Sequence, residues 1–480
     1  MFDKLNEECG VFGVFNNNDE LDVVGLTYFA LYALQHRGQE SCGMAINKDG
    51  IINGYKDLGL VNEVFTKEVV EKLGTGNIAI GHCRYATCGQ GMRSNAQPLM
   101  INHIKGAMAV AHNGSLTNAG ELRKELELGG AIFHATSDTE VIAYTITKER
   151  LSSSSIEEAI SKAMEKIKGA YSMLIMSPKK LIAVRDPFGI RPLSIGKLGN
   201  SYMVASETCA LESNGATFIR DVLPGEIVII DENGLRSITT HCGNKSHLCV
   251  FEFVYFARPD SVIEGSGVHT ARQRAGAYLA LEHPVQADVV IGVPDSGLDA
   301  ALGYAKQSGI PYGVGLLKNK YIGRTFIQPT QAQRENAVRI KLNPVASTLK
   351  DKRVVLVDDS IVRGTTSARI VKLIRDAGAK EVHMRVSSPP FKYPCYFGTD
   401  VDTQENLIGW HLSVAEIEKQ IGVDSLGYLS VKDVQKLAAD SNCNFCVGCF
   451  TGEYPIEVPK SSQKHICEIP ISVKGKKEED

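Results

Sequence analysis

Residues 354–367 read Val-Val-Leu-Val-Asp-Asp-Ser-Ile-Val-Arg-Gly-Thr-Thr-Ser, and this run predicts much of the architecture around it. Four apolar residues predict a buried strand that ends in two carboxylates, Asp358 and Asp359. The turn at 364–366 then opens a predicted helix over 367–377. Backbone N–H groups and hydroxyls at a helix N-terminus suit a phosphate group, and paired carboxylates suit ribose hydroxyls or a Mg²⁺ shell. The run therefore predicts a phosphate-binding loop.

Two further apolar runs, 287–293 and 382–386, predict strands that flank this loop in the sequence. Buried apolar strands alternating with helices are typical of a parallel sheet. The first of these strands ends in the turn Pro294-Asp295-Ser296-Gly297. The second half of the chain is therefore predicted to be an α/β domain. The sequence has no Gly-x-x-x-x-Gly-Lys-Ser/Thr motif, so an ATP-dependent mechanism is not supported.

The loop at 354–367 closely resembles the phosphoribosylpyrophosphate (PRPP) loop of type I phosphoribosyltransferases. The resemblance implies that one set of residues binds PRPP: Asp358, Asp359, Ser360, Arg363, Gly364, Thr365, Thr366 and Ser367. It also implies a Mg²⁺ site at Ser296, Asp358 and Asp359. The segment 318–329 resembles the flexible loop that closes over PRPP, and would supply Lys318, Lys320 and Arg324. Lys320 stands where relatives commonly have Arg, so a bidentate contact is not expected there.

The first half of the chain predicts a different architecture. Strands are expected at 11–16, 41–47, 78–82, 107–111, 171–176, 181–185, 203–206 and 226–230, and helices at 119–126, 138–149 and 156–168. Strands, then helices, then strands again indicate sheets sandwiched between helices, an α+β half. We place the boundary near residue 235, which gives domains at 9–235 and 236–470 and a solvated tail at 471–480.

Cys9 and four sets of residues downstream of it, in this order, resemble the class II glutamine amidotransferases. The four sets lie at 36–41, 81–87, 112–114 and 137–140. The resemblance implies an N-terminal-nucleophile αββα sandwich with Cys9 as the nucleophile. A thiol attacks the amide carbon, and the free α-amine of the same residue serves as the base. That amine exists only if residues 1–8 are removed, so the resemblance implies a propeptide that is cleaved after Glu8.

Four other residues match the remaining positions of this family pattern. Asn113 and Gly114 match the oxyanion hole, Arg84 the site for the glutamine carboxylate, and Asp138 the site for the ammonium group. The ordinary alternatives are a turn at Asn113-Gly114, a surface Arg84, and a helix N-cap at Asp138, which is compatible with ligand binding. His112 is interpreted as a buried structural histidine.

Cys443, Cys446 and Cys449 have the spacing of metal ligands, for zinc or for an iron–sulfur cluster with a fourth ligand from elsewhere. Taken with both preceding resemblances, the chain resembles the glutamine phosphoribosylpyrophosphate amidotransferase family, in its form with a propeptide and a [4Fe–4S] cluster. The resemblance implies Cys249, Cys395, Cys446 and Cys449 as the cluster ligands and leaves Cys443 out.

This resemblance implies an amidophosphoribosyltransferase. Cys9 hydrolyses glutamine, and the ammonia displaces pyrophosphate at C1 of PRPP to give 5-phosphoribosylamine, the first committed step of purine synthesis. It also implies Mg²⁺, a homotetramer and feedback inhibition by purine nucleotides. The alternatives are an amidotransferase with another acceptor, and a PRPP-sensing regulatory protein with an inactive glutaminase half.

The composition excludes several other classes of protein. The net charge is −3, and no long basic run indicates a nucleic-acid surface. No apolar stretch approaches the length of a membrane span. The N-terminal residues are too few and too acidic for a signal peptide, so a cytoplasmic location is expected. The twelve cysteines are then not expected to form disulfides.

Overall fold

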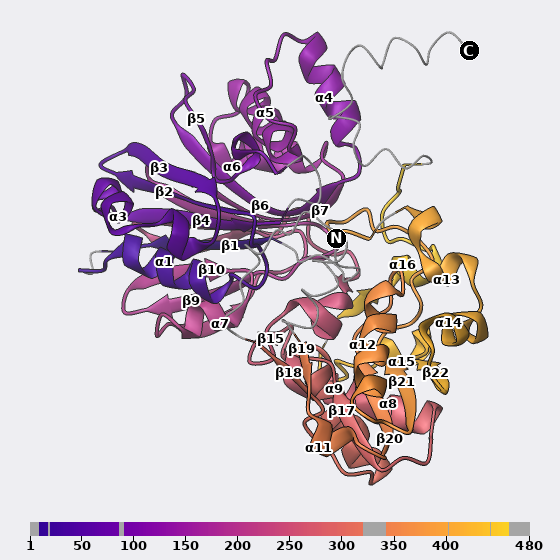
Figure 1. The fold of residues 1–480 in the computed structure, drawn as a ribbon. Coiled ribbons are helices and arrows are strands. Elements are labelled where there is room, and N and C mark those ends of the chain that lie inside the picture. The colour runs from indigo at the N-terminus through magenta and orange to yellow at the C-terminus, as the bar shows by residue number, and fades with distance from the viewer. Residues whose placement is uncertain are drawn as a thin grey trace, which may run out of the picture.

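The computed structural model describes residues 9–17, 20–85, 91–319, 342–401, 403–441 and 443–459. The expected propeptide at 1–8, Lys320, Arg324 and the tail at 471–480 lie outside these residues. The chain forms two lobes, one built by its first half and the other by its second half (Figure 1).

Two antiparallel sheets stack in the first lobe. One sheet has seven strands, in the order β11 (Thr217–Asp221), β9 (Ser194–Leu198), β10 (Ser201–Ala205), β1 (Gly10–Phe15), β4 (Ile78–Arg84), β2 (Ser41–Lys48) and β3 (Ile51–Leu58). The other has six, in the order β13 (Gly234–Ile238), β12 (Ile227–Asp231), β8 (Lys180–Arg185), β7 (Gly169–Ser177), β6 (Met108–Leu116) and β5 (Leu99–Ile101). An apolar core that includes Val11, Ile80 and Leu174 fills the space between them.

Helices cover the outer face of each sheet. The seven-stranded sheet packs against α1 (Val23–Ala33), α2 (Val61–Val64), α3 (Lys67–Leu73) and α7 (Thr208–Glu212). The six-stranded sheet packs against α4 (Ala119–Leu128), α5 (Asp138–Leu151) and α6 (Ile156–Met164). This arrangement confirms the predicted αββα sandwich. The strand pattern was readable because most strands are buried on both faces and therefore form continuous apolar runs.

The second lobe contains the predicted parallel sheet, which has a fourth strand, β22 (Ser425–Tyr428), beyond the three that were expected. Its order is β17 (Val289–Gly292), β20 (Arg353–Asp358), β21 (Glu381–Val386) and β22. One face packs against α8 (Val268–Glu282) and α9 (Gly297–Ser308), and the other against α12 (Thr365–Asp376) and α14 (Val414–Ile421). The smaller described elements include β18 (Leu316–Lys318), β19 (Leu342–Pro344), α11 (Ala346–Leu349), α13 (Ile408–His411) and α15 (Val431–Val434).

A short parallel pair, β14 (His247–Cys249) and β23 (Asn444–Cys446), joins the start of the second lobe to its C-terminal end. The pairing places Cys249 directly opposite Cys446. The π-helical turn η2 (Glu252–Phe256) follows β14, and α16 (Gly448–Thr451) follows β23. The apolar core of this region also contains Ala170 and Ile190 of the first lobe, so the two lobes share buried surface.

The predicted boundary near residue 235 falls within β13, the edge strand of the six-stranded sheet. Residues up to Ile238 therefore pack with the first lobe. No helix among the described residues is long and apolar enough to cross a membrane.

Candidate active sites

The first candidate site lies where both sheets of the first lobe meet α5. Cys9 directly precedes β1, Arg84 ends β4, Asn113 and Gly114 lie in β6, and Asp138 is the first residue of α5. β1 and β4 are neighbours, and their register puts Gly10 opposite Cys83, which places Cys9 beside the end of β4. The Cys9 thiol donates a hydrogen bond to the carbonyl oxygen of Tyr85, over 3.5 Å.

Cys9 is buried among charged groups. Burial raises the pKa of its thiol, the Arg84 guanidinium opposes that rise, and the carboxylate of Asp138 adds to it. Cys9 therefore lies within electrostatic reach of both residues that were predicted to bind the charged ends of glutamine. A thiol with a raised pKa needs a base before it can attack, and an α-amine on the same residue would supply one.

Asn113 carries a buried donor group that suits an oxyanion. Its side chain is 2% exposed, and the amide nitrogen Nδ2 has no hydrogen-bond partner among the described residues. A buried donor without a partner costs stability, so it is expected where a ligand completes it. Gly114 beside it has φ +135°, and a Cβ at this position would lie 2.1 Å from the carbonyl oxygen of Ala170. Only glycine therefore fits at this position of β6.

Asp138 is held by a residue to which the sequence assigned no site role. Its Oδ2 accepts a hydrogen bond of 2.9 Å from the Leu116 backbone, and its Oδ1 lies 3.7 Å from Nδ1 of His112. Burial opposes ionisation of Asp138, but His112, the Leu116 N–H and Arg84 outweigh it and lower the pKa of the carboxyl. His112 is buried, as predicted, and it also keeps this carboxylate charged.

The second candidate site lies at the carboxyl edge of the parallel sheet. Asp358 ends β20 and Asp359 follows it, and both are buried. Asp359 accepts hydrogen bonds from the hydroxyls of Ser296 and of Ser360, the latter over 2.5 Å. The turn after β17 and the loop after β20 therefore meet, as the sequence predicted for a shared Mg²⁺ and phosphate site. Oxygen ligands of this kind are the ones that Mg²⁺ prefers.

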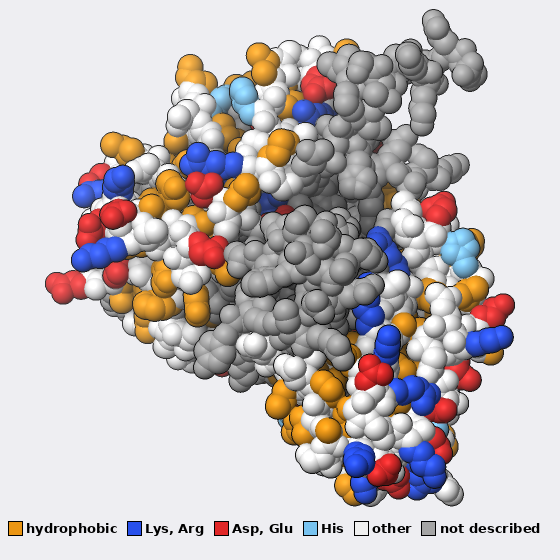
Figure 2. Space-filling model, viewed as in Figure 1, with side chains coloured by type: hydrophobic (Ala, Val, Ile, Leu, Met, Phe, Trp, Pro, Cys, Tyr) orange, Lys and Arg blue, Asp and Glu red, His pale blue; other side chains and the backbone are white. Residues whose placement is uncertain are grey.

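The start of α12 lies at this edge and carries the residues that were predicted to bind phosphate. Gly364 has φ +83° and precedes Thr365 and Thr366, which open the helix, and Ser367 is buried in its first turn. The helix therefore begins with N–H groups and hydroxyls beside the two carboxylates. Lys and Arg side chains gather on this side of the second lobe, over the region of α12 (Figures 1 and 2). Such a surface suits a polyanion although the whole chain has a small negative charge.

The predicted closing loop is described only at its start. Lys318 ends β18, and its ammonium group pairs with the carboxylate of Asp295. Lys318 is thereby held next to the turn that carries Ser296. Lys320 and Arg324, the other predicted cations of this loop, lie outside the described residues.

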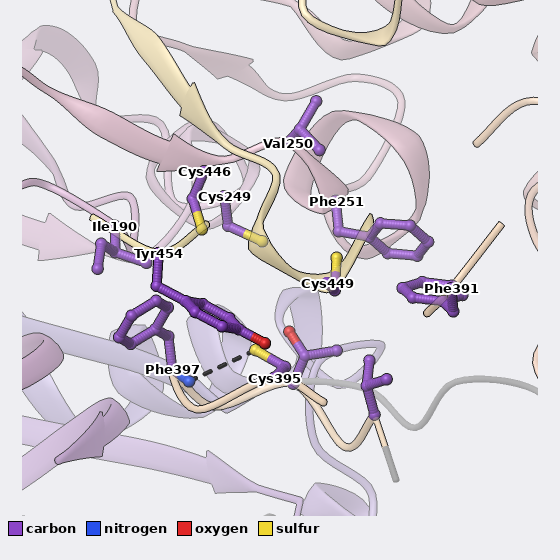
Figure 3. A pocket seen from close by; sticks show the side chains of 12 residues that line it. Ile190, Cys249, Val250, Phe251, Phe391, Cys395, Phe397, Cys446, Cys449 and Tyr454 are labelled. Atoms are coloured by element: carbon purple, nitrogen blue, oxygen red, sulfur yellow. Dashed lines mark hydrogen bonds between the residues drawn. The ribbon is translucent and has the colours of Figure 1, made fainter. Parts of the chain in front are cut away.

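A third candidate site is a cavity lined by four cysteines, Cys249, Cys395, Cys446 and Cys449. The four sulfur atoms face one space, with aromatic rings around it (Figure 3). Burial raises the pKa of the Cys249 and Cys446 thiols to about 12, and that of Cys449 as well. Cys443 does not line this cavity, and its thiol donates to the Ser441 hydroxyl instead.

Four cysteine thiols around one space are a donor set that an iron–sulfur cluster takes. Within the described ranges, no group of three or more Cys, His, Asp or Glu is arranged so that it could hold a single metal ion. Four buried thiols around an apolar space are otherwise an unusual arrangement, because a metal is what normally stabilises their thiolate forms.

Comparison with known proteins agrees with the two halves of the fold. A glutamine amidotransferase domain model matches residues 82–213, and a phosphoribosyl transferase domain model matches residues 274–388. The fold and both sites thus define a glutamine amidotransferase joined to a phosphoribosyltransferase.

Full-length relatives specify the family. The chain is 49% identical over 459 residues to the amidophosphoribosyltransferase of Bacillus subtilis (strain 168), and the match covers 95% of both chains. It is 48% identical over 465 residues to that of Methanocaldococcus jannaschii, with 94% and 98% covered. The solved structure of the Bacillus subtilis glutamine PRPP amidotransferase, complexed with ADP and GMP, superposes with a TM-score of 0.88 at 47% identity, over 94% of this chain and 98% of that one. The chain belongs to the amidophosphoribosyltransferase family, whose enzymes catalyse the first step of purine biosynthesis.

Proposed function

We propose that Cys9 hydrolyses glutamine and that the second lobe transfers the ammonia to C1 of PRPP. The observation that carries this assignment is the position of the Cys9 thiol, within electrostatic reach of both Arg84 and Asp138. Arg84 would bind the glutamine carboxylate and Asp138 its ammonium group. The same three residues would have no reason to converge in a regulatory protein with an inactive glutaminase half.

The chemistry divides between the two sites. The Cys9 sulfur forms a bond to the amide carbon of glutamine, and the C–N bond then breaks to release ammonia. Water hydrolyses the resulting thioester to glutamate and frees the thiol. Asn113 and the Gly114 N–H would stabilise the oxyanion that forms in each step. Ammonia then attacks C1 of PRPP, and pyrophosphate leaves to give 5-phosphoribosylamine.

The α-amine of Cys9 is the base in this scheme. It exists only after residues 1–8 are removed, so cleavage after Glu8 is part of the proposal. At the second site, Ser296, Asp358 and Asp359 would hold Mg²⁺, which offsets the negative charge of the pyrophosphate when bound. Ser360, Arg363, Gly364, Thr365, Thr366, Ser367, Lys318, Lys320 and Arg324 would bind PRPP.

Three further parts of the proposal concern the assembled protein. Cys249, Cys395, Cys446 and Cys449 would hold a [4Fe–4S] cluster with a structural role, because they join β14, β23 and α16 around one cavity. Purine nucleotides would inhibit the enzyme, since the Bacillus subtilis relative was solved with ADP and GMP bound. A cytoplasmic homotetramer remains our expectation from the family resemblance.

The deciding experiment measures glutamine hydrolysis by the purified protein without oxygen. Glutamate and pyrophosphate are followed with and without PRPP and Mg²⁺. We expect PRPP to stimulate hydrolysis and the two products to form together. Cys9→Ala should lose the glutamine reaction but keep the reaction of free ammonia with PRPP. Cys42→Ala is the control, because this thiol is equally buried in the same sheet and was assigned no role.

Each alternative predicts a different result. An equal rate of glutamine hydrolysis with and without PRPP, with no pyrophosphate formed, would indicate a glutaminase with another acceptor. A protein whose measured mass still includes residues 1–8, and which makes no ammonia, would indicate the regulatory alternative.

A further inference from the structure

A buried network of four charges lies between the nucleophile and the second lobe. It consists of Arg37, which follows α1, Arg191 and Glu207 of the first lobe, and Glu252 of the second lobe. All four side chains are fully buried, and their charges balance. Burying charges is expensive unless they are paired and hydrogen-bonded, so such a network is expected to have a purpose beyond stability.

Arg37 connects this network to the nucleophile. Its Nε donates a hydrogen bond of 3.2 Å to the carbonyl oxygen of Cys9. Its other nitrogens donate to Glu207, and to both carboxylate oxygens of Glu252 at 2.7 and 2.8 Å. Burial would lower the pKa of Arg37, but Glu252 and Glu207 outweigh burial and raise it. Arg37 is therefore fixed as a cation that holds the backbone of Cys9.

Through Arg191, Glu252 is also linked to the segment that carries Cys395, a cysteine of the third site. Its Oε1 lies 3.5 Å from Nη1 of Arg191. Arg191 in turn donates to the carbonyl oxygen of Phe397, at 3.1 Å from Nε and 2.7 Å from Nη2. The Phe397 N–H donates to the sulfur of Cys395 over 3.4 Å (Figure 3). A continuous chain of contacts thus runs from Cys395 to Cys9.

The same segment touches the predicted oxyanion hole. A Cβ on Gly398 would lie 3.1 Å from the Cα of Gly114, and 3.2 Å from Nη2 of Arg191. The second lobe therefore packs directly against the backbone of the glutaminase site.

Glu252 is itself rigidly placed. It begins the π-helical turn η2, and Arg272 of α8 donates to three carbonyl oxygens in and just after that turn: those of Phe253, Tyr255 and Ala257, at 2.7–2.8 Å. A π-helical turn is rare and is frequent at functional sites. Glu252 therefore links the second lobe to Arg37 through a fixed geometry.

We propose that Glu252 is a positioning residue for the glutaminase reaction, through which the second lobe holds the backbone of Cys9 in its reactive position. This inference rests on the proposed role of Cys9 as nucleophile. The nucleophilic thiol and the α-amine base belong to one residue, so a bond to the Cys9 carbonyl oxygen orients both. Loss of that orientation slows the reaction without weakening the binding of glutamine, because Glu252 contacts neither Arg84 nor Asp138 in any hydrogen bond of the described structure.

Two substitutions test the proposal in the full-length protein, handled without oxygen. Glu252→Gln removes the charge, and Glu252→Asp keeps the charge but withdraws it by one methylene, so it cannot reach both arginines. We expect each to lower kcat for glutamine about 10-fold to 100-fold, the effect typical of small misplacements of reacting groups. KM for glutamine should change less than about threefold, and the reaction of free ammonia with PRPP should be unchanged.

Glu264→Gln is the matched control. Glu264 belongs to the second lobe and pairs with Arg185 of the first, at 2.6 Å. Arg185 also donates to the backbone carbonyl of Arg191, but among the described residues no hydrogen bond links Glu264 to Glu252, Arg37 or Cys9. The proposal is overturned if kcat for glutamine is the same in the Glu252 variants as in the Glu264→Gln variant. It is also overturned if the ammonia reaction falls in proportion to the glutamine reaction, since that result indicates general destabilisation.

Cys9→Ala separates failure of this proposal from failure of the proposed function. Glutamine hydrolysis that survives in Cys9→Ala would contradict the nucleophile itself. An inactive Cys9→Ala together with normal Glu252 variants would contradict only the role of Glu252.

Discussion

At the scale of single residues, Asn113, whose Nδ2 has no partner within the described part of the chain, gives the most direct test of the oxyanion hole. Replacing it with alanine should lower kcat for glutamine about 10²-fold to 10³-fold, because one donor to the oxyanion is lost. KM for glutamine should change little, since the donor acts mainly in the transition state. Steady-state kinetics measure both values. Asn118→Ala is the control, because the Asn118 side chain bonds the backbone of Lys166 and Lys168 and was assigned no role in the site; an equal loss there would contradict the assignment.

Asp186 should make the stability of the protein depend on pH. Burial raises the pKa of its carboxyl to about 6, against the influence of Arg185 and three backbone N–H groups. The folded state therefore binds more protons than the unfolded state between about pH 4 and pH 6. This contribution to stability is complete below about pH 4 and is lost as the pH rises through 6.

Asp186→Asn should remove this decline, so that the melting temperature falls less between pH 4 and 6 than in the unmodified protein. The comparison variant is Asp231→Asn, because the pKa of Asp231 is lowered and its contribution has the opposite sign. Thermal unfolding followed across this pH range gives the answer. Equal pH dependence in Asp186→Asn and the unmodified protein would contradict the raised pKa.

The sequence could predict those candidate site residues whose side-chain type the proposed reaction requires. Cys9, Asn113 and Asp138 were assigned through a family resemblance, and the pair at 358–359 through the apolar strand that it ends. The partners of these residues were not predictable. Arg37 and Glu252 are 215 positions apart, and a buried ion pair leaves no periodic pattern in either segment.

At the scale of secondary structure, the turn before α12 depends on Gly364. An alanine there would adopt a left-handed conformation, which costs about 1 kcal/mol, and its Cβ would lie 2.9 Å from Cδ1 of Ile408. The phosphate-binding turn would shift, so we expect KM for PRPP to rise about 5-fold to 10-fold, as a loss of about 1 kcal/mol of binding implies.

Gly378→Ala provides the comparison for this experiment. Gly378 follows the other end of α12 and also has a positive φ, +96°, but lies away from the carboxylates. It should lower stability without changing KM for PRPP. Equal KM values in the two variants would contradict the role of Gly364.

The pairing of β14 with β23 makes a separate prediction about the cysteines. Cys446→Ser should abolish the broad visible absorbance of an iron–sulfur cluster in protein purified without oxygen, and should lower the melting temperature. Cys443→Ser should leave the absorbance unchanged, because Cys443 lies outside the cavity. Absorbance lost in both variants would show that Cys443 is also needed.

Helices and strands could be predicted from the sequence where the spacing of apolar residues matches one type of secondary structure. Most of the buried strands of both lobes and α12 were expected, whereas β9 and β22 were not. No helix was predicted at α1 or α8, and these segments lack a clear amphipathic stripe: α1 is almost wholly apolar, and α8 mixes arginines with small residues. The π-helical turn η2 also has no sequence signal of its own, since Arg272 stabilises it from another helix.

At the scale of the whole molecule, the shared core predicts how the chain unfolds. Calorimetry should show one transition rather than one for each lobe, because the charge network and the apolar core at Ala170 and Ile190 cross between them. Separating the lobes would leave Arg37 and Arg191 buried without Glu252. Two resolved transitions in the unmodified protein would contradict this coupling.

The segment from Cys249 to Glu252 limits where halves of different enzymes of this kind can be joined into a hybrid. A hybrid that joins this glutaminase to a foreign acceptor domain at residue 238 would keep Arg37 and Arg191. It would lose Glu252, the carboxylate that contacts both arginines. A junction placed after Phe256 would carry Glu252 along, but would lose the Arg272 contacts that fix its turn. The two halves are therefore not interchangeable. Amino-acid substitutions on the two sides of this contact between the lobes are expected to occur together in evolution.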